Sequence, residues 1–290
     1  MDNSKIIIGT AQLTNNYGIY KHLISDQNIK EILTFAQREN ITYLDTAVDY
    51  NKVHYRLGEF DLSKFNIISK IPKLDNNTQK IRKEIRNLIE NSLKELNVSK
   101  LDGLLMHDLE DMSNIEKRSF IIKELLDLKK ENLIENIGLS IYSPYVLDSM
   151  RNLEDIDIIQ TPLNLIDQRI VRSSWMEKLN NMGIKIHVRS IFLQGLLLAD
   201  QNFLDKNFKP WNLLWSKWFT YLQKNNNVNP IKVCIDFIRS HQNIDKIIVG
   251  VNSIDQLKEI SSYFKNRSTI SFPEILSNDE KLIDPFNWNK

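Results

Sequence analysis

The sequence contains a single cysteine, Cys234, so a disulfide framework is impossible. Cys234 lies in the apolar run IKVCIDFI, and we expect a buried structural thiol rather than a nucleophile. No apolar run is long enough to cross a bilayer, and the strand-like segment KIIIG begins at residue 5, which leaves no room for a signal peptide. We therefore expect a cytoplasmic protein without a membrane partner.

An excess of charge of one sign is also missing, because the formal net charge is +1. A nucleic-acid partner is therefore not expected. The sequence has no linker, no low-complexity tract and no change of composition along its length. Hydrophobic residues make up 42% of the chain and charged residues 26%, which is ordinary for a globular protein with a sizeable core. We expect one domain over residues 1–290.

Short apolar segments alternate with amphipathic ones along the chain. The apolar segments predict eight strands, at residues 5–11, 41–45, 65–71, 100–107, 133–141, 156–162, 184–191 and 244–251. Alternation of strands and helices implies parallel strands joined by crossover helices, and eight units favour a closed (β/α)8 barrel of the α/β class, the TIM barrel. A doubly wound open sheet is the alternative. Its dinucleotide-binding form is disfavoured, since no G-x-G-x-x-G follows the first strand.

Single residues predict several helix boundaries. Asn40, Asn97 and Asn132 each follow an amphipathic segment and tolerate the left-handed conformation that ends a helix. Gly183 closes a helix predicted over residues 168–182. Ser143 precedes Pro144 and is expected to cap another helix.

A segment with three tryptophans interrupts the alternation. We expect an insertion at 196–228 and a C-terminal tail at 266–290, either of which could fold over the mouth of the barrel. We expect Trp211, Trp215 and Trp218 to be core residues of an extra helix rather than residues that stack on a substrate.

Four polar side chains fall where a barrel carries its active site, at the carboxyl ends of the strands. Asp45 ends the second strand, Lys70 lies at the end of the third, and His107 ends the fourth. Tyr50 lies in the loop just beyond Asp45. Adjacent strands lie about 4.8 Å apart, so these side chains are expected to converge. Lys70 would then neutralise Asp45, whose burial alone would cost several kcal/mol.

These residue types suit proton transfer to an oxygen atom. A neighbouring ammonium favours phenolate and so lowers the pKa of a tyrosine from its usual value of about 10. Asp45 would hold that ammonium, and His107 would donate a hydrogen bond to a carbonyl oxygen beside Tyr50. Each residue alone has an ordinary explanation, as a structural ion pair, an edge histidine or a packed loop tyrosine. Their arrival together at one rim favours a functional site.

Nine motifs follow one another along the chain. They are GTAQ at 9–12, YGI at 17–19, DTAVDY at 45–50, ISK at 68–70, LLMH at 104–107, GLS at 138–140, QTPLN at 160–164, RSIFLQGLL at 189–197 and IVGVNSIDQL at 248–257. In this ordered set the sequence resembles the aldo/keto reductase superfamily over nearly its whole length. The resemblance implies a (β/α)8 barrel that uses NAD(P)H. It also implies a catalytic tetrad of Asp45, Tyr50, Lys70 and His107, with Tyr50 as general acid.

The resemblance further implies residues that bind the cofactor. Ser140 and Gln160 correspond to residues that bind the nicotinamide carboxamide, Asn164 lies near them, and Ile141 replaces an Asn of many members. Arg189 replaces an aromatic residue that stacks on the nicotinamide, and a planar guanidinium can stack too. The other implied contacts are Gly9, Thr10, the pyrophosphate loop residues Ser190, Leu193, Gln194 and Gly195, and the adenosine-side residues Gly250, Asn252, Ser253 and Gln256.

The choice between NADPH and NADH stays open. Many NADPH-specific relatives carry Lys and Arg where this chain has Gly250 and Gln256. A dianionic 2′-phosphate favours such partners, so these two residues weaken the family's slight preference for NADPH, with Lys258 and Asn252 as substitutes. The segment HYRLGE at 54–59 also departs from relatives, which commonly have a Glu near His54 or Tyr55. No metal is expected.

The sequence therefore predicts an NAD(P)H-dependent oxidoreductase that reduces an aldehyde, ketone or sugar-like carbonyl to an alcohol, or catalyses the reverse. In one alternative Lys70 is a Schiff-base lysine of an aldolase, although its pairing with Asp45 argues against this. In another, the barrel is a non-catalytic sensor or partner subunit that binds the cofactor. The expected partner is a small-molecule substrate, and the expected state is a monomer or a weak homo-oligomer.

Overall fold

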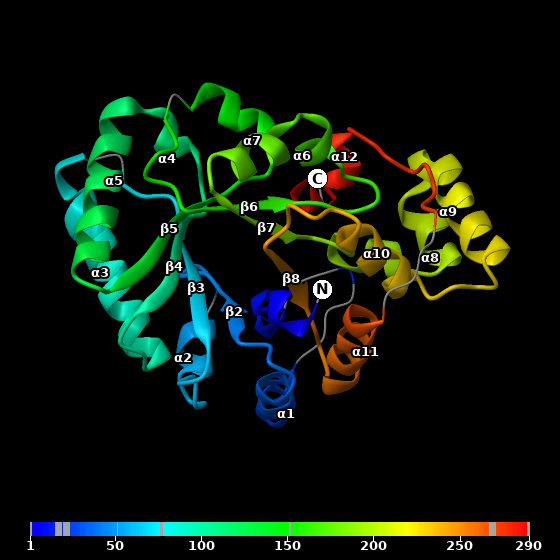
Figure 1. The fold of residues 1–290 in the computed structure, drawn as a ribbon, viewed down its shortest axis with the longest axis horizontal. Helices are drawn as coiled ribbons and strands as arrows, with labels where there is room; N and C mark the ends of the chain where they lie inside the picture. Colours follow the sequence, from blue (N-terminus) through cyan, green and yellow to red (C-terminus); the bar gives the residue numbers. More distant parts are fainter. Residues whose placement is uncertain are drawn as a thin grey trace.

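The computed structural model describes residues 2–14, 19, 24–50, 52–75, 78–150, 152–266 and 271–288. Eight parallel strands close into a barrel in the order of the sequence, surrounded by helices (Figure 1). The first strand pairs with both the second and the eighth, so the (β/α)8 barrel is confirmed and the open sheet is excluded. Tyr17 and Gly18 of the YGI motif lie outside the described residues, as do 267–270 and 289–290 of the expected tail.

The bounds of the elements follow the predicted alternation. The strands are β1 (Ile6–Gly9), β2 (Tyr43–Asp45), β3 (Asn66–Ile71), β4 (Leu101–Met106), β5 (Ile134–Ser140), β6 (Ile158–Pro162), β7 (Lys185–Arg189) and β8 (Lys246–Gly250). The α-helices are α1 (Asp26–Arg38), α2 (Val53–Leu57), α3 (Thr78–Leu96), α4 (Glu110–Ser113), α5 (Ile115–Lys130), α6 (Arg169–Arg172), α7 (Trp175–Asn181), α8 (Gln201–Asn207), α9 (Asn212–Lys224), α10 (Pro230–Arg239), α11 (Ile254–Lys265) and α12 (Glu280–Ile283). Short 3-10 helices lie at η1 (Asn3–Lys5), η2 (Ala11–Leu13), η3 (Pro144–Ser149), η4 (Leu193–Leu198), η5 (Lys209–Trp211) and η6 (Pro285–Asn287).

A small apolar cluster fills the inside of the barrel and forms the floor of its mouth. Its members are Ile7, Ile68, Leu105, Ile158 and Ile248. Side chains of a strand alternate between its two faces, so residues two positions further on also point inward, one layer nearer the carboxyl ends. Those residues are Gly9, Lys70, His107, Gln160 and Gly250. All five were singled out from the sequence.

Strand β2 is shorter than predicted, because it begins at Tyr43 rather than Ile41. The backbone N–H of Ile41 donates to the carbonyl of Ala36 and so belongs to the end of helix α1. A group used in this way cannot join the sheet, although the Ile41 side chain is fully buried.

Predicted helix ends were confirmed at some positions and wrong at others. Asn40, Asn97 and Asn132 all adopt left-handed conformations, as does Gly183. The helix predicted over 168–182 is instead two helices, α6 and α7, because Ser174 between them has a φ of 62°. Ser143 makes no side-chain cap, and the segment after it is the 3-10 helix η3 rather than an α-helix.

The insertion packs against the C-terminal segment. Helices α8 and α9 lie side by side outside the ring of strands, at the right of Figure 1. The rings of Phe208 and Trp288 meet edge to face at 5.2 Å, and Trp211 donates through Nε1 to Asp279. Trp215 and Trp218 are fully buried, which confirms the prediction that they are core residues. Trp211 is only partly buried and lies in η5, just before α9.

Two buried groups inside the protein are kept uncharged. Cys234 in helix α10 is buried, as predicted, and burial raises the pKa of its thiol. His187 of strand β7 is buried inside the barrel, and its Nδ1 has no hydrogen-bond partner. Burial, with the charges of Lys246 and Lys185, lowers the pKa of His187 to about 3.

We predict that His187 makes the fold sensitive to acid. The unfolded chain protonates this imidazole near pH 6.5, while the folded chain does so only near pH 3, so stability falls as the pH drops through this window. The free energy of unfolding of both proteins is compared at pH 7 and pH 4.5. Its fall between these values is expected to be roughly 2 kcal/mol smaller in His187→Gln than in the wild type. Urea unfolding at both pH values measures this. Equal losses in the two proteins would contradict the prediction.

Candidate active site

An ion pair, Asp45 with Lys70, lies at the centre of the barrel's mouth. Asp45 ends β2, Lys70 lies near the end of β3, and the Lys70 Nζ is 2.6 Å from Oδ2 of Asp45. The same ammonium donates to the carbonyl of Thr46 at 2.9 Å. Burial lowers the pKa of Lys70, and the attraction of Asp45 opposes this effect. Both side chains are buried, so each charge depends on the other.

Tyr50 and His107 complete the predicted set. Tyr50 is held in a tight turn, in which its N–H donates to Ala47 and its carbonyl accepts from Val53. The Lys70 Nζ lies 5.5 Å from the centre of the Tyr50 ring, and the His107 ring meets the Tyr50 ring nearly edge-on at 6.2 Å. The structure thus brings together all four side chains that the sequence singled out.

Asp49 orients His107, a contact that the sequence analysis missed. The His107 Nδ1 lies 3.3 Å from Oδ2 of Asp49. Burial is the largest single influence on the pKa of Asp49 and raises it, but the hydrogen bond and charge of His107, with a backbone hydrogen bond and the charge of Lys70, together lower the pKa overall. A nitrogen that faces a carboxylate carries the proton, so a neutral His107 presents its other nitrogen, Nε2, as an acceptor. The expected hydrogen bond from His107 to a carbonyl oxygen, if it comes from Nε2, therefore requires a ring with a proton on both nitrogens.

Ser140 and Gln160 present two unused polar atoms beside the ion pair. Ser140 ends β5 and is paired in register with Gln160 in the middle of β6, and both are buried. The Gln160 Nε2 donates to Oδ1 of Asp45 at 2.7 Å, while the Gln160 Oε1 and the Ser140 Oγ have no partner. An acceptor beside a hydroxyl complements a primary carboxamide, which offers N–H donors and a carbonyl oxygen. These two residues therefore fit the nicotinamide carboxamide.

Thr10 and Asn164 make hydrogen bonds to the backbone around this site. Thr10 donates to the Asp45 carbonyl through its N–H at 2.9 Å and its hydroxyl at 3.0 Å, which joins the ends of β1 and β2. The Asn164 Oδ1 accepts from the N–H groups of Ile166 and Asp167, and its Nδ2 donates to the Ser190 carbonyl. Asn164 thereby ties the loop after β6 to the loop after β7, and its contact with a cofactor stays a prediction.

The loop after β7 adopts backbone conformations that residues with side chains rarely take. Ser190, Leu193 and Gln194 have φ values of 59°, 47° and 51°, and Gly195 follows at 94°. Each such non-glycine residue costs on the order of 1–3 kcal/mol, and such strain tends to cluster at functional sites. This is the segment expected to cover the pyrophosphate.

The segment after β8 forms the capped start of helix α11. The Ser253 hydroxyl accepts from the Gln256 N–H, and the Gln256 Oε1 accepts in return from the N–H of Asn252. Lys258 is exposed and paired with Asp255. A side chain at Gly250 would collide with Gln12, whose amide lies 1.3 Å from the position of a Cβ. These atoms are the far end of a flexible side chain that can move aside, so the contact does not by itself require glycine at position 250.

The C-terminal segment borders the mouth next to Arg189. A cavity of about 70 Å³ is lined by Tyr142, Arg189 and Pro162 from the strand ends and by Ile283 and Asp284 from the tail. The Arg189 guanidinium lies 4.5 Å from the centre of the Tyr142 ring and donates to the Ile141 carbonyl. The tail, rather than the tryptophans of α9, therefore approaches the mouth.

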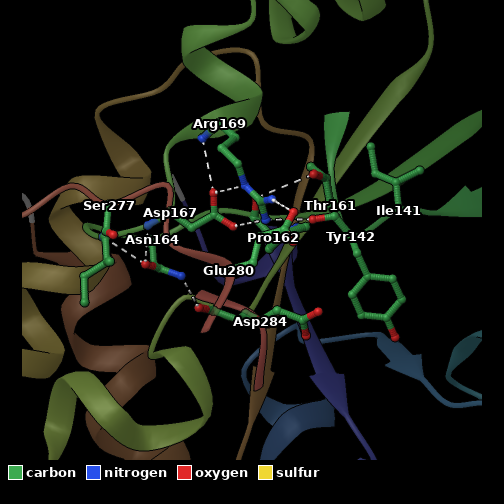
Figure 2. Close-up of polar contacts among 12 residues, drawn as sticks. Ile141, Tyr142, Thr161, Pro162, Asn164, Asp167, Arg169, Ser277, Glu280 and Asp284 are labelled. Atoms are coloured by element: carbon green, nitrogen blue, oxygen red, sulfur yellow. Dashed lines mark hydrogen bonds and ion pairs between the residues drawn. The ribbon is translucent and has the colours of Figure 1, made fainter. Parts of the chain in front are cut away.

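A buried pair, Asp167 with Arg169, supports this border. Arg169 donates to both carboxylate oxygens of Asp167 at 2.9 Å and to the Tyr142 carbonyl, and Glu280 of the tail lies 3.9 Å away (Figure 2). The Ser277 N–H donates to the Ile166 carbonyl, which fixes the tail to the same loop. This pair was not predicted, because its only signal in the sequence is an Arg two residues after an Asp.

Among the residues that the structure describes, no group of His, Cys, Asp and Glu is arranged to hold a metal ion. Within the same ranges, every helix is too short or too polar to cross a bilayer.

Comparisons with known proteins agree with this geometry. The model of the aldo/keto reductase family matches residues 5–277. Aldo-keto reductase YhdN of Bacillus subtilis (strain 168) is 28% identical over 154 residues, which are 49% of this chain and 46% of that protein. The match therefore spans about half the length of that curated relative.

Two solved structures share the fold. Aldo-keto reductase AKR11C1 of Bacillus halodurans, in its holo form, has a TM-score of 0.71 at 18% identity, over 92% of this chain and 88% of that one. PA4992 of Pseudomonas aeruginosa, assigned to the aldo-keto reductases, has a TM-score of 0.65 at 20% identity, over 90% and 89%. At these identities the likeness shows the fold alone.

We predict that Lys70→Met lowers the free energy of unfolding by about 3–5 kcal/mol, because it leaves Asp45 buried without a counter-charge. Adding Asp45→Asn is expected to recover most of the loss. Lys258→Met is the matched control, since its exposed pair with Asp255 contributes less than about 1 kcal/mol. Chemical denaturation measures all three, and a Lys70 variant as stable as the control would contradict the prediction.

Proposed function

Because this chain belongs to the aldo/keto reductase family, and thus to the oxidoreductases of carbonyl substrates, we propose that it uses NAD(P)H to reduce an aldehyde or ketone, including a sugar-like carbonyl, to an alcohol, or catalyses the reverse. The observation that carries this proposal is the buried Asp45–Lys70 pair, which lies against the ring of Tyr50. The His107 ring also meets that ring, nearly edge-on at 6.2 Å.

The mechanism assigns proton transfer to this chain's own residues. A bound NAD(P)H supplies a hydride for the carbonyl carbon. Tyr50 gives its proton to the carbonyl oxygen, and the Lys70 ammonium, held by Asp45, stabilises the phenolate that remains. A protonated His107, oriented by Asp49, donates to the same oxygen as negative charge develops there.

The residues proposed to hold the cofactor lie around this centre. Ser140 and Gln160 would take the carboxamide, since their free atoms have the right polarity. The strained loop with Ser190, Leu193, Gln194 and Gly195 would cover the pyrophosphate, and Gly9 and Thr10, at the end of β1, would also contact the cofactor. The N-terminus of α11, with Asn252, Ser253 and Gln256, would receive the adenosine end, because the dipole of a helix favours negative charge at its N-terminus.

The finer assignments are also proposals. We propose a cytoplasmic, single-domain protein that is a monomer or a weak homo-oligomer and takes a small-molecule carbonyl substrate.

Two observations bear on the alternative functions. A Schiff-base lysine must reach a substrate carbonyl, yet Lys70 is 1% exposed and donates to both Asp45 and Thr46. This disfavours the aldolase. A non-catalytic sensor would have no need for a phenol, an ammonium and an imidazole gathered at one point, so the reductase is the better explanation.

Tyr50→Phe tests the mechanism. We expect turnover of a good carbonyl substrate to fall at least about 100-fold, since general acid catalysis contributes on the order of 10²–10⁴, while dinucleotide affinity stays within about twofold. Steady-state kinetics and fluorescence titration measure the two quantities. Tyr55→Phe, on an exposed tyrosine of α2, is the control and should match the wild type. Unchanged turnover in Tyr50→Phe would show that another group donates the proton.

Titration with NADH and NADPH tests the cofactor. Quenching of tryptophan fluorescence should show binding, and the wild type is expected to discriminate less than about 10-fold, because no Lys or Arg occupies positions 250 and 256. Gln256→Arg should shift the ratio of the two Kd values toward NADPH by roughly 10-fold, and Gln256→Met serves as the uncharged control. Failure of the wild type to bind either dinucleotide would refute the proposed function.

A further inference from the structure

One side chain, Gln160, touches both the ion pair and the place proposed for the carboxamide. Its Nε2 donates to Oδ1 of Asp45 at 2.7 Å, while the Lys70 ammonium occupies Oδ2 of the same carboxylate at 2.6 Å. All three side chains are buried, and Gln160 is fully so. In a site of low dielectric such linked hydrogen bonds polarise one another.

The orientation of the Gln160 amide is fixed by chemistry. An ionised carboxylate only accepts hydrogen bonds, so Asp45 requires the NH₂ end of Gln160. The Oε1 is thereby turned away from Asp45, and it is one of the few buried side-chain atoms without a partner in the described part of the chain. The Gln160 Oε1 can therefore accept a hydrogen bond from an N–H donor, and it cannot bind a carbonyl oxygen.

Ser140 provides the contrast that isolates this effect. It is the register partner of Gln160 across β5 and β6, and its Oγ is likewise buried without a partner. It makes no hydrogen bond to Asp45 in the structure. Loss of Ser140 therefore removes a contact for the carboxamide and leaves the ion pair as it is.

We propose that Gln160 is a positioning residue that couples recognition of a primary carboxamide to the Asp45–Lys70 pair. The inference rests on the proposed function, because the carboxamide is that of the nicotinamide. An amide that donates to a carboxylate has a more negative oxygen, so Asp45 strengthens the bond that Gln160 Oε1 accepts. Reciprocally, a carboxamide N–H on Oε1 makes Nε2 a better donor to Asp45 and holds that carboxylate for Lys70.

A cycle of variants and ligands tests the coupling. Dissociation constants are measured by tryptophan fluorescence for the preferred reduced dinucleotide, for its 3-acetylpyridine analogue and for ADP-ribose. The analogue has a methyl group in place of the amide NH₂, and ADP-ribose lacks the ring altogether. The variants are Asp45→Asn, Gln160→Met and Ser140→Ala, with Asp45→Asn also combined with each of the other two.

The coupling predicts a specific pattern of affinities. Asp45→Asn should raise the Kd of the dinucleotide about fivefold, both in the wild-type background and in the Ser140→Ala background. In the Gln160→Met background the same substitution should raise the Kd by less than twofold. The wild type should bind the acetylpyridine analogue roughly 10-fold more weakly, since Oε1 is then buried without a donor. Asp45→Asn should change the Kd of the analogue and the Kd of ADP-ribose by less than twofold.

Turnover gives a second readout. At saturating dinucleotide, Gln160→Met should lower kcat about 10-fold more than Ser140→Ala does, because Gln160 donates a hydrogen bond to Asp45 and Ser140 does not. Equal effects of Asp45→Asn in the wild-type and Gln160→Met backgrounds would overturn the coupling, as would a comparable loss of ADP-ribose binding. If the wild type bound ADP-ribose but neither dinucleotide, the proposed function would fail instead.

Discussion

The mouth of this barrel depends on the burial of one opposite-charge pair. Lys70 and Asp45 lie one layer above an apolar floor of Ile7, Ile68 and Leu105, where water cannot solvate either charge. Three neighbouring residues contact the pair. Thr46 accepts a second hydrogen bond from the ammonium, Gln160 donates to the other carboxylate oxygen, and the centre of the Tyr50 ring lies 5.5 Å from the ammonium nitrogen. The stability of each charge therefore depends on the other.

The period of a strand explains why so much of the site was readable in the sequence. Residues two positions beyond the inner apolar cluster point into the mouth. This places Lys70 and His107, which the strand ends predict, and also Gln160, which only the family resemblance singled out. The closed barrel follows from the eight repeats. The left-handed conformations of Asn40, Asn97 and Asn132 could be predicted from residue type alone, because few residue types other than glycine and asparagine adopt that conformation readily.

Contacts between distant loops were not readable in this way. Asp49 reaches His107 only because β2 and β4 end at the same rim, and Arg169 reaches Tyr142 only after two loops have folded. Ser174 breaks a segment whose apolar spacing is helical, since local backbone geometry outweighs the pattern. Nothing in the spacing of Gln160 and Asp45, 115 residues apart, predicts a hydrogen bond between them. Strand register supplies that information.

The contact between the insertion and the tail has an evolutionary consequence. Phe208 and Trp288 meet although they lie at opposite ends of the last third of the chain, and Trp211 is bonded to Asp279. The tail lines the cavity beside Arg189, and the insertion packs against the tail, so the insertion acts on this wall only through the tail. Mutations in either can reshape what enters the mouth while the chemistry beneath stays fixed. Exchange of one segment between relatives should fail unless the other travels with it.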